Sequence, residues 1–235
     1  MKRFLLSIIA ILSALNLWAQ EDIYANIGPI TEQLSNFNSI EVNAPIKLKL
    51  TKVDKSTTPS ITYDTKGFYT SKFTHEVSDK GVLKIEERSD PKRESITEVE
   101  VLFNELSDIS ISKADVTVVG TLDSMLLDLY ISNDSHFTAE VNTLDICVNA
   151  SGKCCIILSG EARYQTVDIS TAEYDAARLS TTATVATSSH NAIVRVNASE
   201  RLEAKTSTGG KILYRTDPVI LRSAITLFGG DIKLQ

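Results

Sequence analysis

The chain has 235 residues and a formal net charge of −6, with no cluster of basic residues. An acidic chain of this kind argues against nucleic acid and anionic membranes as partners. The length suffices for one large domain or two small ones.

Residues 1–20 have the features of a signal peptide. Lys2 and Arg3 form a charged start, residues 4–17 are mostly apolar, and Ala19 offers a small residue for cleavage. The apolar run is too short and too interrupted to span a bilayer, and no longer one follows, so we expect no membrane span after cleavage. Removing the two basic residues lowers the charge to about −8. The sequence therefore predicts export to the periplasm, the outer-membrane surface or the medium.

The chain divides into two parts after a linker expected at residues 21–36. Four of the five prolines occur by position 91, and the next is Pro218. Proline cannot donate to a sheet ladder, so the long proline-free stretch permits an uninterrupted stack of strands. We therefore predict an N-terminal β-strand region at 37–105, packed on a solenoid at 106–235.

The N-terminal region shows short strands with alternating apolar and polar residues. Strands are expected at 40–42 and 46–50, and another from residue 96. Asp79-Lys80-Gly81 separates two further apolar segments and predicts a hairpin. Helical periodicity is hard to find after the signal region.

A degenerate repeat with a period near 20 runs through the second part. Five nine-residue segments superimpose without gaps, starting at Leu127, Leu144, Val167, Ala183 and Leu202. Each alternates apolar and polar residues and ends in residues that tolerate a sharp corner. Such a period with strand-like content is typical of a solenoid in which each turn stacks on its neighbour. The fold class predicted is all-β, a right-handed parallel β-helix.

This alignment makes a specific prediction about the core. The third positions of four successive segments should stack as one buried column; these are Leu129, Ile146, Ile169 and Val185. The inward residues become smaller toward the C-terminus, so we expect the last turns to open most easily.

Three motifs resemble a known family. FNSIEVNAPIKLKL at 37–50 resembles the opening strand pair of the adhesins that carry the head GIN domain. LSGEA at 158–162 is similar to a middle element of that family, and GKILY at 210–214, followed by Pro218, to its closing element. The family's Gly-Ser-Gly corners are replaced here by other small and polar residues. The resemblance covers roughly 37–234 and implies an exported β-solenoid with an adhesive role.

Three carboxylates occupy the second position of successive repeats. In this alignment Asp128, Asp145 and Asp168 face outward and stack at the strand spacing of about 4.8 Å. A calcium ladder is conceivable, because carboxylates this close repel or recruit a cation. The alternative, which we prefer, is that unequal repeat lengths leave the three acids solvated. No metal site or cofactor is therefore predicted.

The three cysteines leave two alternatives open. Cys147 could form a bridge with the pair Cys154 and Cys155, or all three could be small hydrophobic residues of a strand. We prefer the second, and no spacing resembles a zinc site.

Other candidate residues give weak signals. The chain after residue 20 has no tryptophan, so an aromatic sugar platform would have to use tyrosines; the candidates are Tyr130, Tyr164, Tyr174 and Tyr214. His136 and His190 lie at or beside expected corners, and none of the histidines is near a serine or cysteine in a recognisable nucleophile context. No catalytic residue is predicted.

The sequence therefore predicts an exported, non-enzymatic β-solenoid for adhesion, surface interaction or envelope structure. Its partner would be a surface protein or a glycan. The first alternative is a carbohydrate-active β-helix protein, because such folds also host lyases and glycosidases whose carboxylates come from distant turns. The second is an assembly module, since exposed solenoid ends can pair with another chain.

Overall fold

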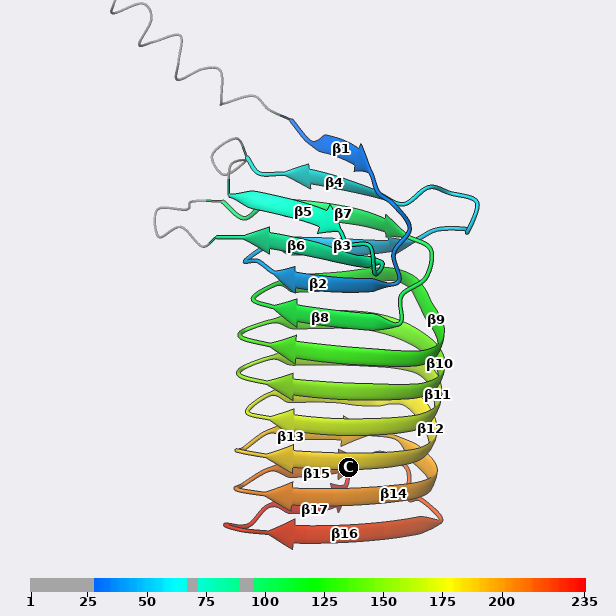
Figure 1. The fold of residues 1–235 in the computed structure, drawn as a ribbon. Coiled ribbons are helices and arrows are strands. Elements are labelled where there is room, and N and C mark those ends of the chain that lie inside the picture. The colour runs from blue at the N-terminus through cyan, green and yellow to red at the C-terminus, as the bar shows by residue number, and fades with distance from the viewer. Residues whose placement is uncertain (1–27, 67–71, 89–94) are drawn as a thin grey trace, which may run out of the picture.

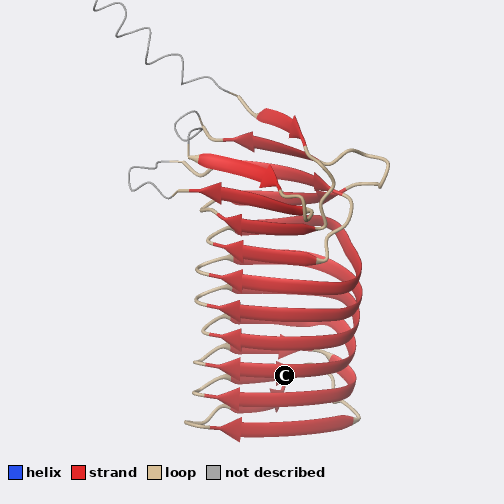
Figure 2. Ribbon diagram, viewed as in Figure 1, coloured by secondary structure: helices blue, strands red, loops and turns tan. Residues whose placement is uncertain are grey.

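The computed structural model describes residues 28–66, 72–88 and 95–235, and in these ranges the protein is built from strands wound into one solenoid (Figures 1 and 2). The expected signal peptide at 1–20 lies outside the described residues, as does most of the expected linker. The predicted all-β solenoid is confirmed, with seventeen strands hydrogen-bonded into one continuous sheet and no helix in the described ranges. Accordingly, those ranges hold no helix long and apolar enough to cross a membrane.

The strands are numbered in chain order. The first eight are short: β1 Ile30–Gln33, β2 Ser39–Asn43, β3 Lys47–Lys52, β4 Ser60–Asp64, β5 Phe73–Val77, β6 Val82–Glu87, β7 Glu98–Phe103 and β8 Asp108–Ser112. Four long strands follow: β9 Asp115–Ser132, β10 His136–Ser151, β11 Cys155–Ser170 and β12 Glu173–Ser189. The last five are β13 Ile193–Val196, β14 Ala198–Ser207, β15 Lys211–Tyr214, β16 Ile220–Thr226 and β17 Asp231–Leu234.

Each long strand makes almost a full turn of the solenoid. It runs along one flat side, bends around a curved edge, runs back along the other side and ends at a sharp corner (Figure 1). Parallel pairing joins β9 to β10, β10 to β11 and β11 to β12. From the curved edge onward, equivalent residues lie 19 positions apart, as Leu129 pairs with Val148 and Val148 with Val167. Before that edge the spacing is 21 between β9 and β10 and 18 between β11 and β12, with a register shift at the bend.

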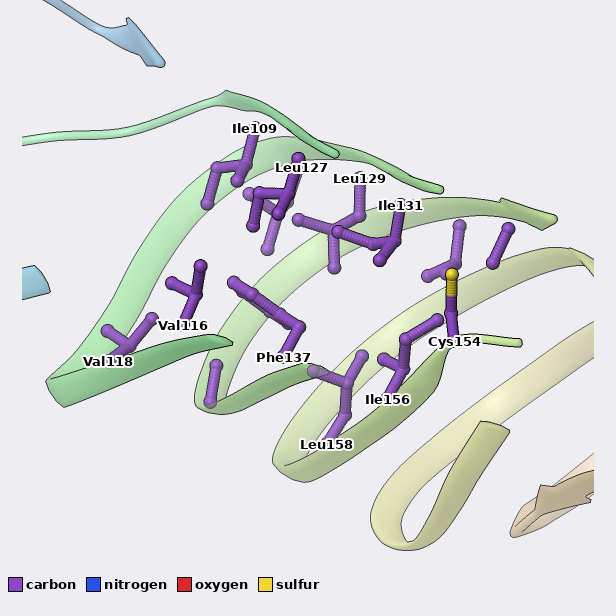
Figure 3. Close-up of a cluster of buried hydrophobic side chains, with 14 of the residues drawn as sticks. Ile109, Val116, Val118, Leu127, Leu129, Ile131, Phe137, Cys154, Ile156 and Leu158 are labelled. Carbon is purple, nitrogen blue, oxygen red and sulfur yellow. The ribbon is translucent and has the colours of Figure 1, made fainter. Parts of the chain in front are cut away.

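Inward residues of successive turns form continuous apolar columns. One column contains Val99, Leu48, Val116, Phe137, Ile156, Tyr174, Val194, Ile212 and Ile232. Figure 3 shows part of this interior, with Phe137 and Ile156 reaching toward Leu129 and Ile131 from the opposite side. Since no single turn can cover its own inner face, the stability of the fold comes from stacking.

The predicted single column was wrong. Leu129, Ile146 and Ile169 are buried but belong to three different columns, because Ile146 pairs with Leu127 and Ile169 pairs with Ala150. Val185 lies on the outer surface and is 45% exposed. The true column of Leu129 continues as Val148, Val167 and Ala186, so the aligned residues were displaced from it by one or two positions. The displacement of one residue at Val185 reversed its face.

Left-handed residues form the sharp corners. Asn133 and Asp134 have φ values of 56° and 58°, and His190 and Asn191 have 52° and 61°. These agree with the predicted corners, but the corner predicted at residues 173–175 was wrong. The turn there is made at Thr171, with φ 59°, and Glu173 already begins β12.

The LSGEA segment marks the curved edge. Gly160 has φ 106°, and a Cβ at this position would lie 2.1 Å from the carbonyl oxygen of Val141 in the preceding turn. Only glycine fits such a close approach. Leu158 and Ala162, on either side of Gly160, are buried.

The N-terminal strands enter the stack out of chain order. β2 lies between β6 and β8, and β3 lies between β7 and β9, all in parallel. Antiparallel strands then cover the end, since β5 pairs with β6, and β4 joins β7 to β1. The predicted hairpin is the β5–β6 pair.

The C-terminal end has no such cover. β16 and β17 pair with β14 and β15 on one side, and in the described structure no strand lies on their other side (Figure 1). All seven residues of β16 are exposed, including inward-facing Leu221 and Ile225.

Candidate functional site

A polar groove follows the curved edge of the solenoid. Its rungs are outward residues of successive turns: Asp123, Asn142, Glu161, Ser180, Asn197 and Thr216. Two hollows of about 680 and 530 Å³ lie along it and share Asn142, Thr143 and Arg163. We call this surface the edge groove. At the strand spacing of about 4.8 Å, its six rungs extend over about 24 Å.

Hydrogen bonds hold the two ends of the edge groove. The Asn142 side-chain amide donates to Asp123 at 3.1 Å, and Lys52 also pairs with that carboxylate. The hydrogen bond from Lys52, followed by the one from Asn142, holds the pKa of Asp123 below its ordinary value. At the other end, Thr216 donates to the Asn197 side chain at 2.7 Å. Asp123 is therefore an ionised hydrogen-bond acceptor at neutral pH.

Amphipathic side chains border the same groove. Arg163 lines both hollows, and its guanidinium carbon lies 5.3 Å from the centre of the Tyr164 ring. Tyr164 is 42% exposed, and Met125, two turns away, is also exposed. Because the strand bends here, Arg163 and Tyr164 both point outward although they are consecutive.

A buried polar network supports the floor. The hydroxyls of Thr181 and Thr184 lie 2.8 Å apart, and Thr184 donates to Gln165 Oε1 at 3.1 Å. Gln165 in turn donates to the hydroxyl of Tyr174 on the opposite side of the coil. All four side chains are buried, and burial raises the pKa of Tyr174 far above its ordinary value. Satisfied networks of this kind fix side-chain positions, so the groove rests on a rigid base.

A third hollow, of about 570 Å³, lies near the N-terminal end but is a weaker candidate. Three of its four carboxylates already have lysine partners, since Glu100 pairs with Lys49, and Lys66 contacts both Asp64 and Glu98. Such paired surface charges offer little to a ligand.

The proposed column of three aspartates does not form. Asp128 lies opposite Cys147, Asp145 opposite Leu126, and Asp168 opposite Asn149. The three carboxylates therefore occupy three separate columns on the outer surface. In the described ranges, no group of three or more His, Cys, Asp or Glu side chains is placed to hold a metal ion.

The three cysteines are free thiols in the structure. Cys154 is buried at a corner, where its thiol contacts the backbone oxygens of Ser151 and Gly152. Cys147 and Cys155 are half-buried, and burial raises the pKa of all three thiols. They behave as small core and strand residues, the alternative that the sequence favoured.

The candidate tyrosines divide into two pairs. Tyr174 and Tyr214 are buried, whereas Tyr130 and Tyr164 are 45% and 42% exposed. Only Tyr164 adjoins the edge groove. His136 begins β10 and is exposed, and His190 lies at a corner, 3.1 Å from the Ser170 hydroxyl.

The sequence interpretation missed Asn142, Glu161 and Arg163. The signal was present, because Asp123, Asn142, Glu161 and Ser180 recur every 19 residues. A search for polar residues at that constant spacing would have found these four rungs, but not Asn197, which follows Ser180 after 17 residues.

The fold places the chain in the class of extended β-solenoids, a scaffold that does not by itself specify a chemistry. The chain belongs to the family described as putative auto-transporter adhesin, head GIN domain, whose model matches residues 36–218. None of the curated proteins matches it.

Solved structures share the fold at low sequence identity. A putative adhesin from Bacteroides fragilis is 18% identical, with a TM-score of 0.81 over 90% of this chain and 99% of that one. A putative adhesin from Parabacteroides merdae is 16% identical, with a TM-score of 0.66 over 90% and 98%. A putative lipid binding protein from Parabacteroides distasonis is also 16% identical, with a TM-score of 0.60 over the same shares. At these identities the likeness establishes the fold alone.

Proposed function

We propose that this protein is an exported, non-enzymatic adhesin that binds an extended carbohydrate chain along the edge groove. The observation that carries the proposal is the ladder of hydrogen-bonding side chains, repeated at one rung per turn over five intervals. The family supports an adhesive role at the cell surface.

The side chains of the groove suit a polymer rich in hydroxyl groups. Asn142, Ser180 and Asn197 each donate and accept hydrogen bonds, as sugar hydroxyls do. The partly exposed ring of Tyr164 provides an apolar face beside the polar rungs, an arrangement suited to stacking against a sugar ring.

A peptide strand fits the edge groove less well. Peptides commonly add to a free sheet edge through their backbone. Here the strands beneath the groove already pair on both sides, so only side chains face a ligand.

The test is a glycan array probed with the mature protein, followed by calorimetry on the best ligand. Arg163→Ala and Tyr164→Ala should each weaken binding by about tenfold or more, as loss of a charged hydrogen-bond donor or an aromatic platform does. Tyr130→Ala is the matched control, because Tyr130 has similar exposure but lies away from the groove. Equal affinities for all variants, or no glycan bound, would overturn the proposal.

The alternative carbohydrate-active function would use the same groove. Asp123 and Glu161 flank Asn142 in the ladder, about 9.6 Å apart at two strand spacings. That separation is close to the range for inverting glycosidases, in which one carboxylic acid has a raised pKa. The pKa of Asp123 is lowered instead, so Glu161 would have to be the acid. Release of reducing ends that is abolished by Glu161→Gln would establish the alternative.

A further inference from the structure

The open C-terminal end of the solenoid is rich in exposed apolar side chains. Phe228 is 89% exposed and Val219 83% exposed, and the others are Ile220, Leu221, Ile225, Leu227 and Leu234. If each of the seven is given the lower end of the range for aromatic side chains, about 150 Å², their exposed fractions amount to roughly 700 Å². That approaches the about 800 Å² per partner of a stable protein interface.

Among the residues that the structure describes, the backbone at this end is also unpaired on one side. In β16 and β17, alternate residues direct their N–H and C=O groups away from β14 and β15, which is the arrangement to which another strand adds. At the opposite end the outermost strands, β1 and β5, run antiparallel to the strands they pair with, so that end does not offer the parallel arrangement through which one coil continues into the next.

We infer that a second copy of this chain covers this end, forming a two-fold dimer in which β16 pairs with β16 and β17 with β17, both antiparallel. The axis would pass through Ser223 in β16 and Ile232 in β17. These residues face one another across the coil. The last corner lies between Ile225 and Gly230, which are equivalent to Thr206 and Gly210 one turn earlier. The two strands run in opposite directions away from this corner. The residue two positions before Ile225, Ser223, therefore lies across the coil from the residue two positions after Gly230, Ile232.

The sequence of β16 is self-complementary about Ser223. Inward-facing Leu221 would meet Ile225 of the second copy, and Val219 would meet Leu227. The interior of each solenoid would thus continue into the other, and side chains now exposed would be covered.

The sequence of β17 is complementary in charge about Ile232. Asp231 and Lys233 contact each other within one chain at 2.9 Å. In the dimer each would lie directly opposite its counterpart of opposite sign, a favourable cross-strand pair.

The other possible two-fold arrangement is disfavoured. It would pair β16 of one copy with β17 of the other and place Arg222 opposite Lys233. Like charges directly opposite one another destabilise a strand pair. The dimer that we infer avoids this contact, because Arg222 lies opposite Ala224 and keeps its ion pair with Glu203.

Cysteine cross-linking tests the register directly. Two Ser223→Cys residues would have Cβ atoms about 4.5–5.5 Å apart across the axis, close enough for a disulfide after a small adjustment. In Thr226→Cys, the matched control, the two residues are about 20 Å apart because they lie six strand positions from each other. Mild oxidation should give a covalent dimer with Ser223→Cys only. The native cysteines are present in every sample, so the wild-type protein reveals any dimer that they form.

Charge exchange tests the same interface without cysteine chemistry. Light scattering and sedimentation should show a dimer for the wild type. Asp231→Lys and Lys233→Asp should each weaken it by about tenfold, since two symmetric attractive pairs become repulsive, and the double exchange should restore it. Lys80→Asp, at the exposed hairpin of the covered end, should have no effect. A wild-type protein that stays monomeric, or cross-linking as efficient in Thr226→Cys as in Ser223→Cys, would overturn the inference.

Discussion

The two ends of the solenoid differ although their coils are built alike. At the N-terminal end, the inward residues Leu83 and Val101 are completely buried because antiparallel strands cover them. At the C-terminal end, Leu221 and Ile225 occupy equivalent inward positions and remain exposed. The comparison shows that an inward-facing apolar residue stabilises a solenoid only when coils or caps lie on both sides of it.

The interior also changes between the ends. The column through Leu127 and Ile146 continues as Gln165 and Thr184, which are buried but polar. Farther on, Thr206 has a buried hydroxyl that finds no hydrogen-bond partner in the described residues. The last coils therefore gain less from burial, and that they open most easily stays a prediction.

The largest effect is expected from placing a charge in the middle of the stack. Ile146→Asp should lower the free energy of unfolding by about 4 kcal/mol or more, because an unpaired carboxylate would be buried. Ile225→Asp, at an inward but exposed position, should cost less than about 1 kcal/mol. Urea denaturation followed by circular dichroism measures both. Both variants should be compared at a protein concentration where the chain is monomeric. Equal losses in the free energy of unfolding would then show that the C-terminal coil is covered in solution.

A smaller effect should distinguish two glycines. Gly160→Ala should cost about 2–4 kcal/mol, because its Cβ would meet the Val141 carbonyl and its φ is positive. Gly229 also has a positive φ, of 78°, but a Cβ there would meet no atom within 4 Å. Gly229→Ala should therefore cost only the conformational penalty of about 1 kcal/mol. If urea denaturation gives the same free energy of unfolding for both variants, close packing at the curved edge does not control stability.

Hydrogen exchange should map the gradient without any substitution. Amides of β11 and β12 should be protected to nearly the global free energy of unfolding, whereas those of β16 and β17 should open locally at little cost. Raising the protein concentration should protect β16 and β17 selectively if they form the dimer interface. Uniform protection along a monomeric chain would contradict the gradient.

Much of the fold could be predicted from the sequence, but its register could not. The period near 20, the missing prolines and most corners indicated a solenoid correctly. The alignment first slipped at Leu144, because the true partner of Leu127, Ile146, lies two residues later in an equally apolar strand. It failed again at Gln165 and Thr184, since it moved to the nearby apolar residues Val167 and Ala183. The core accepts these polar residues because they hydrogen-bond to one another. Their presence interrupts the apolar pattern from which the repeat would be aligned.

The edge groove could not be predicted for a related reason. Its rungs are outward polar residues that look like ordinary solvated positions within any one turn. They become a surface only when turns stack at a constant spacing, as the pairings of Asp123 with Asn142 and of Asn142 with Glu161 show. A wrong register therefore produced a false column of aspartates and concealed the real ladder.

The smallest effect concerns metal and tests that corrected register. Chelator should shift the melting temperature of the mature protein by less than about 1 °C, because Asp128, Asp145 and Asp168 lie in separate columns and do not converge on one cation. An ion bound at a hundred times its Kd would add about 2.7 kcal/mol to the free energy of unfolding. For a chain of this size, that corresponds to about 5–10 °C in the melting temperature. A thermal scan with and without chelator, repeated after adding calcium, separates the two outcomes clearly. A drop of several degrees that Asp145→Asn removes would mean that the outer acids do share an ion, and that the turns carrying them lie closer in register than the strand pairing shows.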